Sequence, residues 1–217
     1  SAASVPDSVD GLPVLGIRDT DLAPMGFHAR GVVIVAGLAQ SGRTSALRWL
    51  AESVHRRFPE TPLVHISARR SPLSGLAIWQ NSSVGPEGSE ELIRVLKDLA
   101  TNAAPEDAPM MAIYVEYLPE FVGTKVETAL TELVKLCRRN GHLLVADGET
   151  SGWGSSWGLL TECRNARTGI LLQPDTVDGD TVVRTSLPRT KRGDFPVGRG
   201  YWVSAGKATR VQLPLVD

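Results

Sequence analysis

A glycine-rich segment at residues 37–44 has the residue types and the spacing of a phosphate-binding loop. Gly37 ends an apolar run, and Gly42 follows after four intervening residues, with Arg43 and Thr44 directly behind it. In the G-x4-G-K-[ST] pattern, backbone N–H groups of the loop bind phosphate oxygens, the cation neutralises them and the hydroxyl contacts Mg²⁺. The spacing therefore predicts binding of ATP together with Mg²⁺.

Arg43 stands where this pattern has lysine. Arginine keeps the positive charge on a planar guanidinium, which holds a phosphate bidentately but approaches the β- and γ-oxygens less closely than an ammonium does. The residues expected to contact the nucleotide are Gly37, Gln40, Ser41, Gly42, Arg43, Thr44 and Ser45, with Thr44 also on the metal. The alternative is a strand, a turn and a helix that bind no ligand.

A second apolar run, residues 111–115, ends in Glu116 and Tyr117. In P-loop enzymes such a strand ends in an acid that holds Mg²⁺, and a further residue orients the nucleophile. Glu116 takes the first place and is the candidate catalytic and metal-side acid. Tyr117 takes the second place and cannot act as a base near neutral pH. Glu120 would replace it only if the chain turns back. We therefore expect weak or absent hydrolysis; the alternative for Glu116 is a strand-end residue that faces solvent.

The elements that position these residues follow from apolar runs that alternate with amphipathic segments. The runs expected to form strands are residues 32–36, 63–67, 110–115, 143–146 and 169–172, and the expected helices cover residues 43–57, 92–99 and 126–137. Strands that alternate with helices imply a mainly parallel α/β sheet covered on both faces. Residues 182–183, 201–203 and 210–213 are expected to be edge or hairpin strands, which gives antiparallel strands at the C-terminal side of the sheet. We expect a lead-in at residues 1–10 and one domain over residues 11–217.

The composition excludes several classes of protein. The 217 residues have a formal net charge of −1, so no overall field favours nucleic acid or an anionic membrane. No apolar run approaches the ~20 residues of a membrane span, and no signal peptide is present, which indicates a cytoplasmic segment without direct membrane insertion. Cys137 and Cys163 are typical of reduced thiols, and the four histidines lack metal-ligand spacing.

Three segments together resemble the FtsK/SpoIIIE group of RecA-like P-loop motor ATPases. They are the lead-in at residues 12–24, the loop Ser41-Gly42-Arg43-Thr44 and the late segment Phe195-Pro196-Val197-Gly198-Arg199-Gly200-Tyr201-Trp202. The resemblance covers residues 11–215. The group includes DNA translocases, the EccC-type ATPases of type VII secretion and actinobacterial relatives.

The resemblance implies a RecA-like domain at the end of a longer, membrane-anchored chain with further ATPase domains. It also implies ring or hexamer assembly, with a secreted protein or DNA as the transported substrate. Downstream domains of such chains commonly have degenerate motifs and serve regulation or substrate recognition. This sequence departs from the family pattern at Tyr117, where the second acid stands, and at Asp147, near the place of a polar sensor.

Two further groups of residues are candidates for contacts with partners. The basic residues between 184 and 199, together with Arg164 and Arg167, fit phosphate contacts or an arginine donated to a neighbouring nucleotide site. The alternative is a solvated hairpin tip. Trp153 and Trp157 either line a groove for an apolar peptide or cover the domain core.

Three functions are consistent with the sequence. The first is a nucleotide-binding, regulatory domain of a translocase with little turnover. The second is an interaction module that has lost nucleotide and recognises a protein partner or a secretion signal. The third is an active motor whose ATPase activity is stimulated by DNA and lost at high salt.

Overall fold

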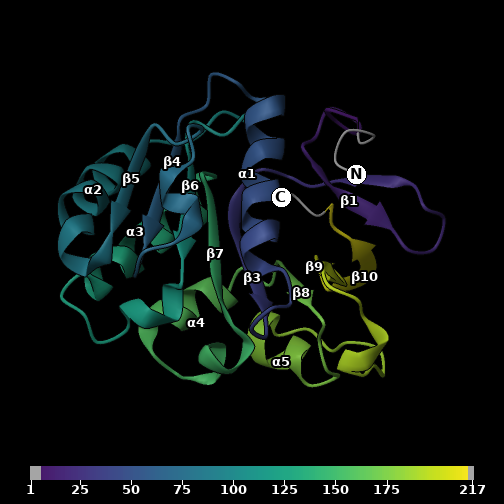
Figure 1. The fold of residues 1–217 in the computed structure, drawn as a ribbon. Coiled ribbons are helices and arrows are strands. Elements are labelled where there is room, and N and C mark those ends of the chain that lie inside the picture. Colours follow the sequence, from purple (N-terminus) through teal and green to yellow (C-terminus); the bar gives the residue numbers. More distant parts are fainter. Residues whose placement is uncertain (1–5, 215–217) are drawn as a thin grey trace.

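The computed structural model describes residues 6–214. Its centre is a ten-stranded sheet with the strand order β2-β1-β10-β9-β8-β3-β7-β6-β4-β5 (Figure 1). The strands are β1 (Val14–Arg18), β2 (Pro24–Gly26), β3 (Gly31–Gly37), β4 (Leu63–Ser67), β5 (Asn81–Val84), β6 (Ala112–Glu116), β7 (Leu143–Glu149), β8 (Gly169–Leu172), β9 (Arg199–Ser204) and β10 (Lys207–Gln212). The helices are α1 (Arg43–Arg57), α2 (Gly85–Ala100), α3 (Glu127–Asn140), α4 (Gly158–Arg164) and α5 (Asp178–Val183).

The strands from β8 to β5 are parallel, as the alternation of strands and helices predicts. β3 pairs with β8 on one side and with β7 on the other, and β7 separates β3 from β6. The carboxyl ends of these strands lie at one edge of the sheet. This edge therefore brings together the ends of β3, β7 and β6, which carry the phosphate-loop glycine and two acids.

Side chains that alternate along β3 build two cores. Val33 and Val35 belong to the core that also contains the buried face of α1. Val32 and Ile34 belong to the core on the other face, which contains buried residues of α2, α3, α4 and α5. Because a strand buried on both faces has no polar side, its sequence is a continuous apolar run. Figure 1 shows α1 lying along one face of the sheet.

The remaining strands, β9, β10, β1 and β2, are antiparallel and extend the sheet beyond β8. This confirms the expected antiparallel strands at the C-terminal side, and β1 and β2 from the N-terminal part of the chain belong to the same sheet. Gly200 lies on β9 opposite Leu172 of β8, and an added Cβ would stand 1.9 Å from the carbonyl oxygen of Leu171. The backbones approach so closely here that only glycine fits.

One expected element is wrong. Residues 182–183 are not an edge strand but the end of α5, with Val182 and Val183 buried in the core. The helix expected over residues 126–137 is present as α3, and Gly141 caps its end with a φ of 78°. None of the helices within residues 6–214 has the length and apolar character needed to cross a bilayer.

Candidate functional site

The loop between β3 and α1 has the backbone geometry of an anion site. Gln40 and Gly42 have left-handed φ values of 65° and 97°. No side chain caps the start of α1, so the first N–H groups of the helix, at Arg43, Thr44 and Ser45, open onto the loop. Left-handed residues in such a turn direct successive N–H groups to one concave side, and the helix dipole adds positive charge there. The loop therefore fits the phosphates of a nucleotide.

The late glycine segment holds this loop in place. The N–H of Gly198 donates to the carbonyl of Ser41 at 3.1 Å, and an added Cβ at Gly42 would stand 3.2 Å from Cγ1 of Val197. Beneath the loop, the Ser41 hydroxyl is buried without a hydrogen-bond partner, and a Cβ at Gly37 would stand 2.3 Å from it. Two segments that are far apart in the sequence thus form one structural unit.

Arg43 points to a carboxylate of the neighbouring strand β7. Its Nη1 donates to Oδ2 of Asp147 at 3.1 Å, and the two side chains are 13% and 3% exposed. Oδ1 of Asp147 accepts the N–H of Tyr117 at 2.6 Å. Burial raises the pKa of Asp147 to about 6, and the Tyr117 N–H and Arg43 oppose this shift by stabilising the carboxylate. The contact of Arg43 with phosphate stays a prediction; its contact with Asp147 is present in the structure.

Glu116 is buried at the end of β6, so the alternative that it faces solvent is wrong. Its Oε2 lies 3.1 Å from Nε2 of His65, and Nδ1 of His65 lies 3.0 Å from the hydroxyl of Ser82. His65 also stacks on Trp79, with ring centroids 5.1 Å apart. Oε1 of Glu116 is buried without a partner. The carboxylate is thus held by a histidine of β4 in this structure, and a role in holding Mg²⁺ stays a prediction.

Tyr117 follows Glu116 in a left-handed conformation with a φ of 58°. The chain then turns back through a short 3₁₀ helix, Leu118–Phe121, in which the N–H of Glu120 donates to the carbonyl of Tyr117. The Arg69 guanidinium lies 4.1 Å from the centroid of the Tyr117 ring and pairs with Glu120 at 3.3 Å. Burial raises the pKa of Tyr117, and nearby Glu116 adds to this effect. A phenol with a raised pKa stays protonated near neutral pH.

Tyr117, Glu120, Arg69 and Arg43 line one cavity of about 160 Å³ beside the loop. Within residues 6–214, no three His, Cys, Asp or Glu side chains are grouped as metal ligands. Bound Mg²⁺ often keeps several waters and takes only one or two protein ligands beside substrate phosphates. These residues are compatible with a metal that arrives with the nucleotide, and Thr44 as its protein ligand stays a prediction.

The raised pKa of Asp147 makes stability depend on pH. The protonated form is favoured in the folded state, so its stabilising contribution is full below about pH 4 and is lost as pH rises through about 6. This difference in the pKa of Asp147 between the folded and the unfolded state corresponds to about 3 kcal/mol in the free energy of unfolding. We expect the free energy of unfolding of the wild type to fall by about 2–3 kcal/mol relative to that of Asp147→Asn as the pH rises from about 4 to 7. Urea unfolding of both proteins measures this difference. A difference between the two proteins that does not change with pH would contradict this.

Sequence reasoning missed Asp147 as the partner of Arg43 and His65 as the partner of Glu116. One signal for Asp147 was available, because it ends the apolar run of β7 as Glu116 ends that of β6. For His65 the signal was weaker, since a single histidine within the buried strand β4 is more often structural. Neither pairing follows from the spacing of residues along the chain.

The other candidate residues are distributed over several sites. Trp153 is fully buried and belongs to the core, whereas Trp157 is exposed. In the basic segment, Arg192 pairs with Asp175 and Asp178. These two ion pairs support a structural role for Arg192.

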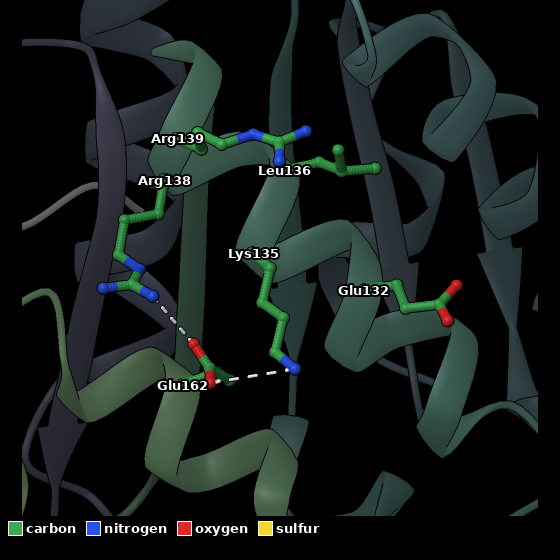
Figure 2. Close-up of a pocket in the computed structure, with 6 residues that line it drawn as sticks. All are labelled: Glu132, Lys135, Leu136, Arg138, Arg139 and Glu162. Atoms are coloured by element: carbon green, nitrogen blue, oxygen red, sulfur yellow. Dashed lines mark hydrogen bonds and ion pairs between the residues drawn. The ribbon is translucent and has the colours of Figure 1, made fainter.

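A larger, open pocket of about 690 Å³ lies between α3 and α4, on the face of the sheet opposite α1. Charged side chains dominate it, and Glu162 pairs with Arg138 at 2.9 Å and with Lys135 at 3.9 Å (Figure 2). Leu136 adds an apolar part. The pocket belongs to a different surface from the P-loop.

Neither a family model nor a curated protein matches the sequence. Solved structures do match its fold. ATPases 2 and 3 of EccC from Thermomonospora curvata, in complex with a signal sequence peptide, align with a TM-score of 0.78 and 20% identity over 100% of this chain and 43% of that one. ATPases 2 and 3 of EssC from Geobacillus thermodenitrificans align with a TM-score of 0.75 and 18% identity over 96% and 42%.

The conjugation coupling protein TcpA of pCW3, in its monomer form with ATPγS, aligns with a TM-score of 0.67 and 15% identity over 99% of this chain and 72% of that one. This chain spans less than half the length of the EccC and EssC chains. At these identities the likeness concerns the fold. The chain therefore has the P-loop ATPase fold found in EccC, EssC and TcpA, which confirms the fold expected from the resemblance.

Proposed function

We propose that this chain is a nucleotide-binding domain of a longer translocase, which binds ATP with Mg²⁺ but hydrolyses it slowly or not at all. The observation that carries the proposal is the uncapped start of α1 behind a loop with left-handed residues at Gln40 and Gly42. In this arrangement the N–H groups of Arg43, Thr44 and Ser45 hold the phosphates, and the Thr44 hydroxyl contacts the metal. Bound Mg²⁺ would neutralise phosphate charge.

Slow turnover is supported by the residues at the ends of β6 and β7. Glu116 is paired with His65, Arg43 is paired with Asp147, and the residue after Glu116 is a tyrosine. A positioned general base contributes about 10²–10⁴-fold to rate. Tyr117 cannot supply it near neutral pH, and Glu120, which the turn after β6 brings into the same cavity, is paired with Arg69 at 3.3 Å. Binding of nucleotide would then act on the packing of this domain against its neighbours rather than drive transport directly.

The partners in this proposal are further ATPase domains of the same chain, in a ring or hexamer, in the cytoplasmic part of a membrane-anchored protein. The EccC structure, which holds a signal sequence peptide, favours a secreted protein over DNA as the substrate. The net charge of −1 points the same way, because a DNA-binding surface needs an excess of cations. The active DNA motor is therefore the less supported hypothesis.

The test is calorimetric titration of the chain with Mg-ATP and with Mg-ATPγS. We expect micromolar binding by the wild type and at least tenfold weaker binding by Thr44→Ala, because this variant loses the hydroxyl that contacts the metal. Thr131→Ala on α3 is the matched control, since the Thr131 hydroxyl only donates to the Glu127 carbonyl of its own helix. Its affinity should equal that of the wild type.

An interaction module without nucleotide is the second candidate function. The Arg43–Asp147 pair favours it, because this pair supplies a carboxylate where a phosphate would otherwise meet the guanidinium. The open α3–α4 pocket provides a separate surface for a protein partner. Absence of heat at millimolar nucleotide in the wild type, with an unchanged fold, would favour this module over the nucleotide-binding domain.

A further inference from the structure

The ion pair between Arg43 and Asp147 links the start of α1 to the end of β7. Both carboxylate oxygens of Asp147 are used, one by the Tyr117 N–H at 2.6 Å and the other by Nη1 of Arg43 at 3.1 Å. Since the first partner is a backbone group next to β6, the sheet fixes the position of the carboxylate. The carboxylate in turn fixes the direction of the guanidinium.

Arg43 occupies the lysine position of the phosphate loop, so its guanidinium is the side-chain cation that an incoming phosphate would meet. An arginine fork binds a carboxylate and a phosphate by the same planar geometry. The two anions therefore compete for one donor group. Because Asp147 is buried and Arg43 is only 13% exposed, solvent screens their attraction only weakly.

Acidic groups near Asp147 also make this part of the site unfavourable for an anion. The negative charges of Glu116 and Glu120 both disfavour the charged form of Asp147 and so add to the rise of its pKa. The triphosphate is an anion as well, and a buried carboxylate beside the loop repels it. Asp147 thus opposes nucleotide in two ways, by holding the guanidinium and by its own charge.

We infer that Asp147 is a positioning residue that competes with nucleotide phosphate for Arg43 and so lowers the nucleotide affinity of the P-loop. The inference rests on the proposed function, because it assigns the regulation of the same site. A neighbouring domain or a substrate that displaced Asp147 from Arg43 would raise the affinity for nucleotide. The pair thereby links nucleotide binding at the phosphate loop to the positions of β6 and β7, whose ends carry Tyr117 and Asp147.

The test compares Mg-ATP binding by the wild type and by Asp147→Asn. Asparagine keeps an oxygen for the Tyr117 N–H, removes the charge and presents an amide to Arg43, which releases the guanidinium. We expect the affinity to rise at least tenfold. Asp180→Asn on α5 is the control for a change in net charge alone, because Asp180 is exposed and accepts only from the Ser186 hydroxyl; its affinity should change less than threefold. In an Arg43→Ala background, Asp147→Asn should lose most of its effect.

Unchanged or weaker binding by Asp147→Asn, with a wild type that binds, would overturn the inference and leave the proposed function standing. Binding by Asp147→Asn alone would support the inference in its strongest form, in which the pair excludes nucleotide from the wild type. Absence of binding by both proteins would contradict the proposed function and the inference together. Asp147→Ala, with the same expected gain, replaces the asparagine variant if circular dichroism shows that the latter does not fold.

Discussion

Replacement of His65 by alanine is expected to lower the free energy of unfolding by about 3–5 kcal/mol, because it leaves a buried carboxyl group without its hydrogen-bond partner and opens a cavity in the core. His65 and Glu116 are both fully buried, and Oε1 of Glu116 already lacks a partner. Without the imidazole, neither oxygen of the carboxylate has a side-chain partner within the sheet. The variant also loses the stack on Trp79. Urea unfolding at neutral pH, followed by circular dichroism, measures the loss.

The matched control is His28→Ala, because His28 is exposed. Its free energy of unfolding should stay within about 0.5 kcal/mol of the wild type. Glu116→Gln tests the cause, since an amide removes the buried charge. In that background the cost of His65→Ala should shrink. A loss below about 1 kcal/mol for His65→Ala in the wild-type background would show that the histidine is not what holds the carboxylate.

Much of the fold could be predicted because its signals are local. The strands β3, β6 and β7 are buried on both faces, and each begins with a continuous apolar run. A short apolar run of this kind favours a buried strand over a loop or an exposed strand. The loop between Gly37 and Thr44 combines backbone requirements with a cation and a hydroxyl at fixed spacing, so one short segment is enough to predict an anion site there. The late segment around Gly198 was recognised by resemblance, and the structure supplies its physical role in holding Ser41.

The pairs Arg43–Asp147 and His65–Glu116 could not be predicted in this way. The two residues of each pair are 104 and 51 residues apart in the sequence, respectively. Only the sheet order β3-β7-β6-β4 brings them together. Spacing along the chain places an acid at a strand end but does not say which cation it meets. The error at residues 182–183 has a related origin: two adjacent valines favour a strand, but packing against the core outweighs that local preference.

Gly42→Ala is expected to destabilise the protein and to distort the phosphate loop. Gly42 has a φ of 97°, and an added Cβ would stand 3.2 Å from Val197 and 3.3 Å from the N of Gly198. The strained backbone costs about 1–3 kcal/mol and the crowding about 1–2 kcal/mol, so we expect a loss of about 2–5 kcal/mol in the free energy of unfolding. Mg-ATP affinity should fall at least tenfold, because relief of the crowding moves the first N–H groups of α1.

Gly88→Ala makes the same chemical change where the structure allows it. Gly88 lies within α2, has no left-handed φ, and an added Cβ there would meet nothing within 4 Å. Alanine is favoured over glycine inside a helix by about 0.5–1 kcal/mol, so this variant should be more stable than the wild type. Urea unfolding of both variants, with titration of Mg-ATP, compares them directly. If Gly42→Ala were as stable as Gly88→Ala and bound nucleotide normally, the left-handed turn and its contact with Val197 would not be what shapes the loop. The late glycine segment would then be packing beside the P-loop without supporting it.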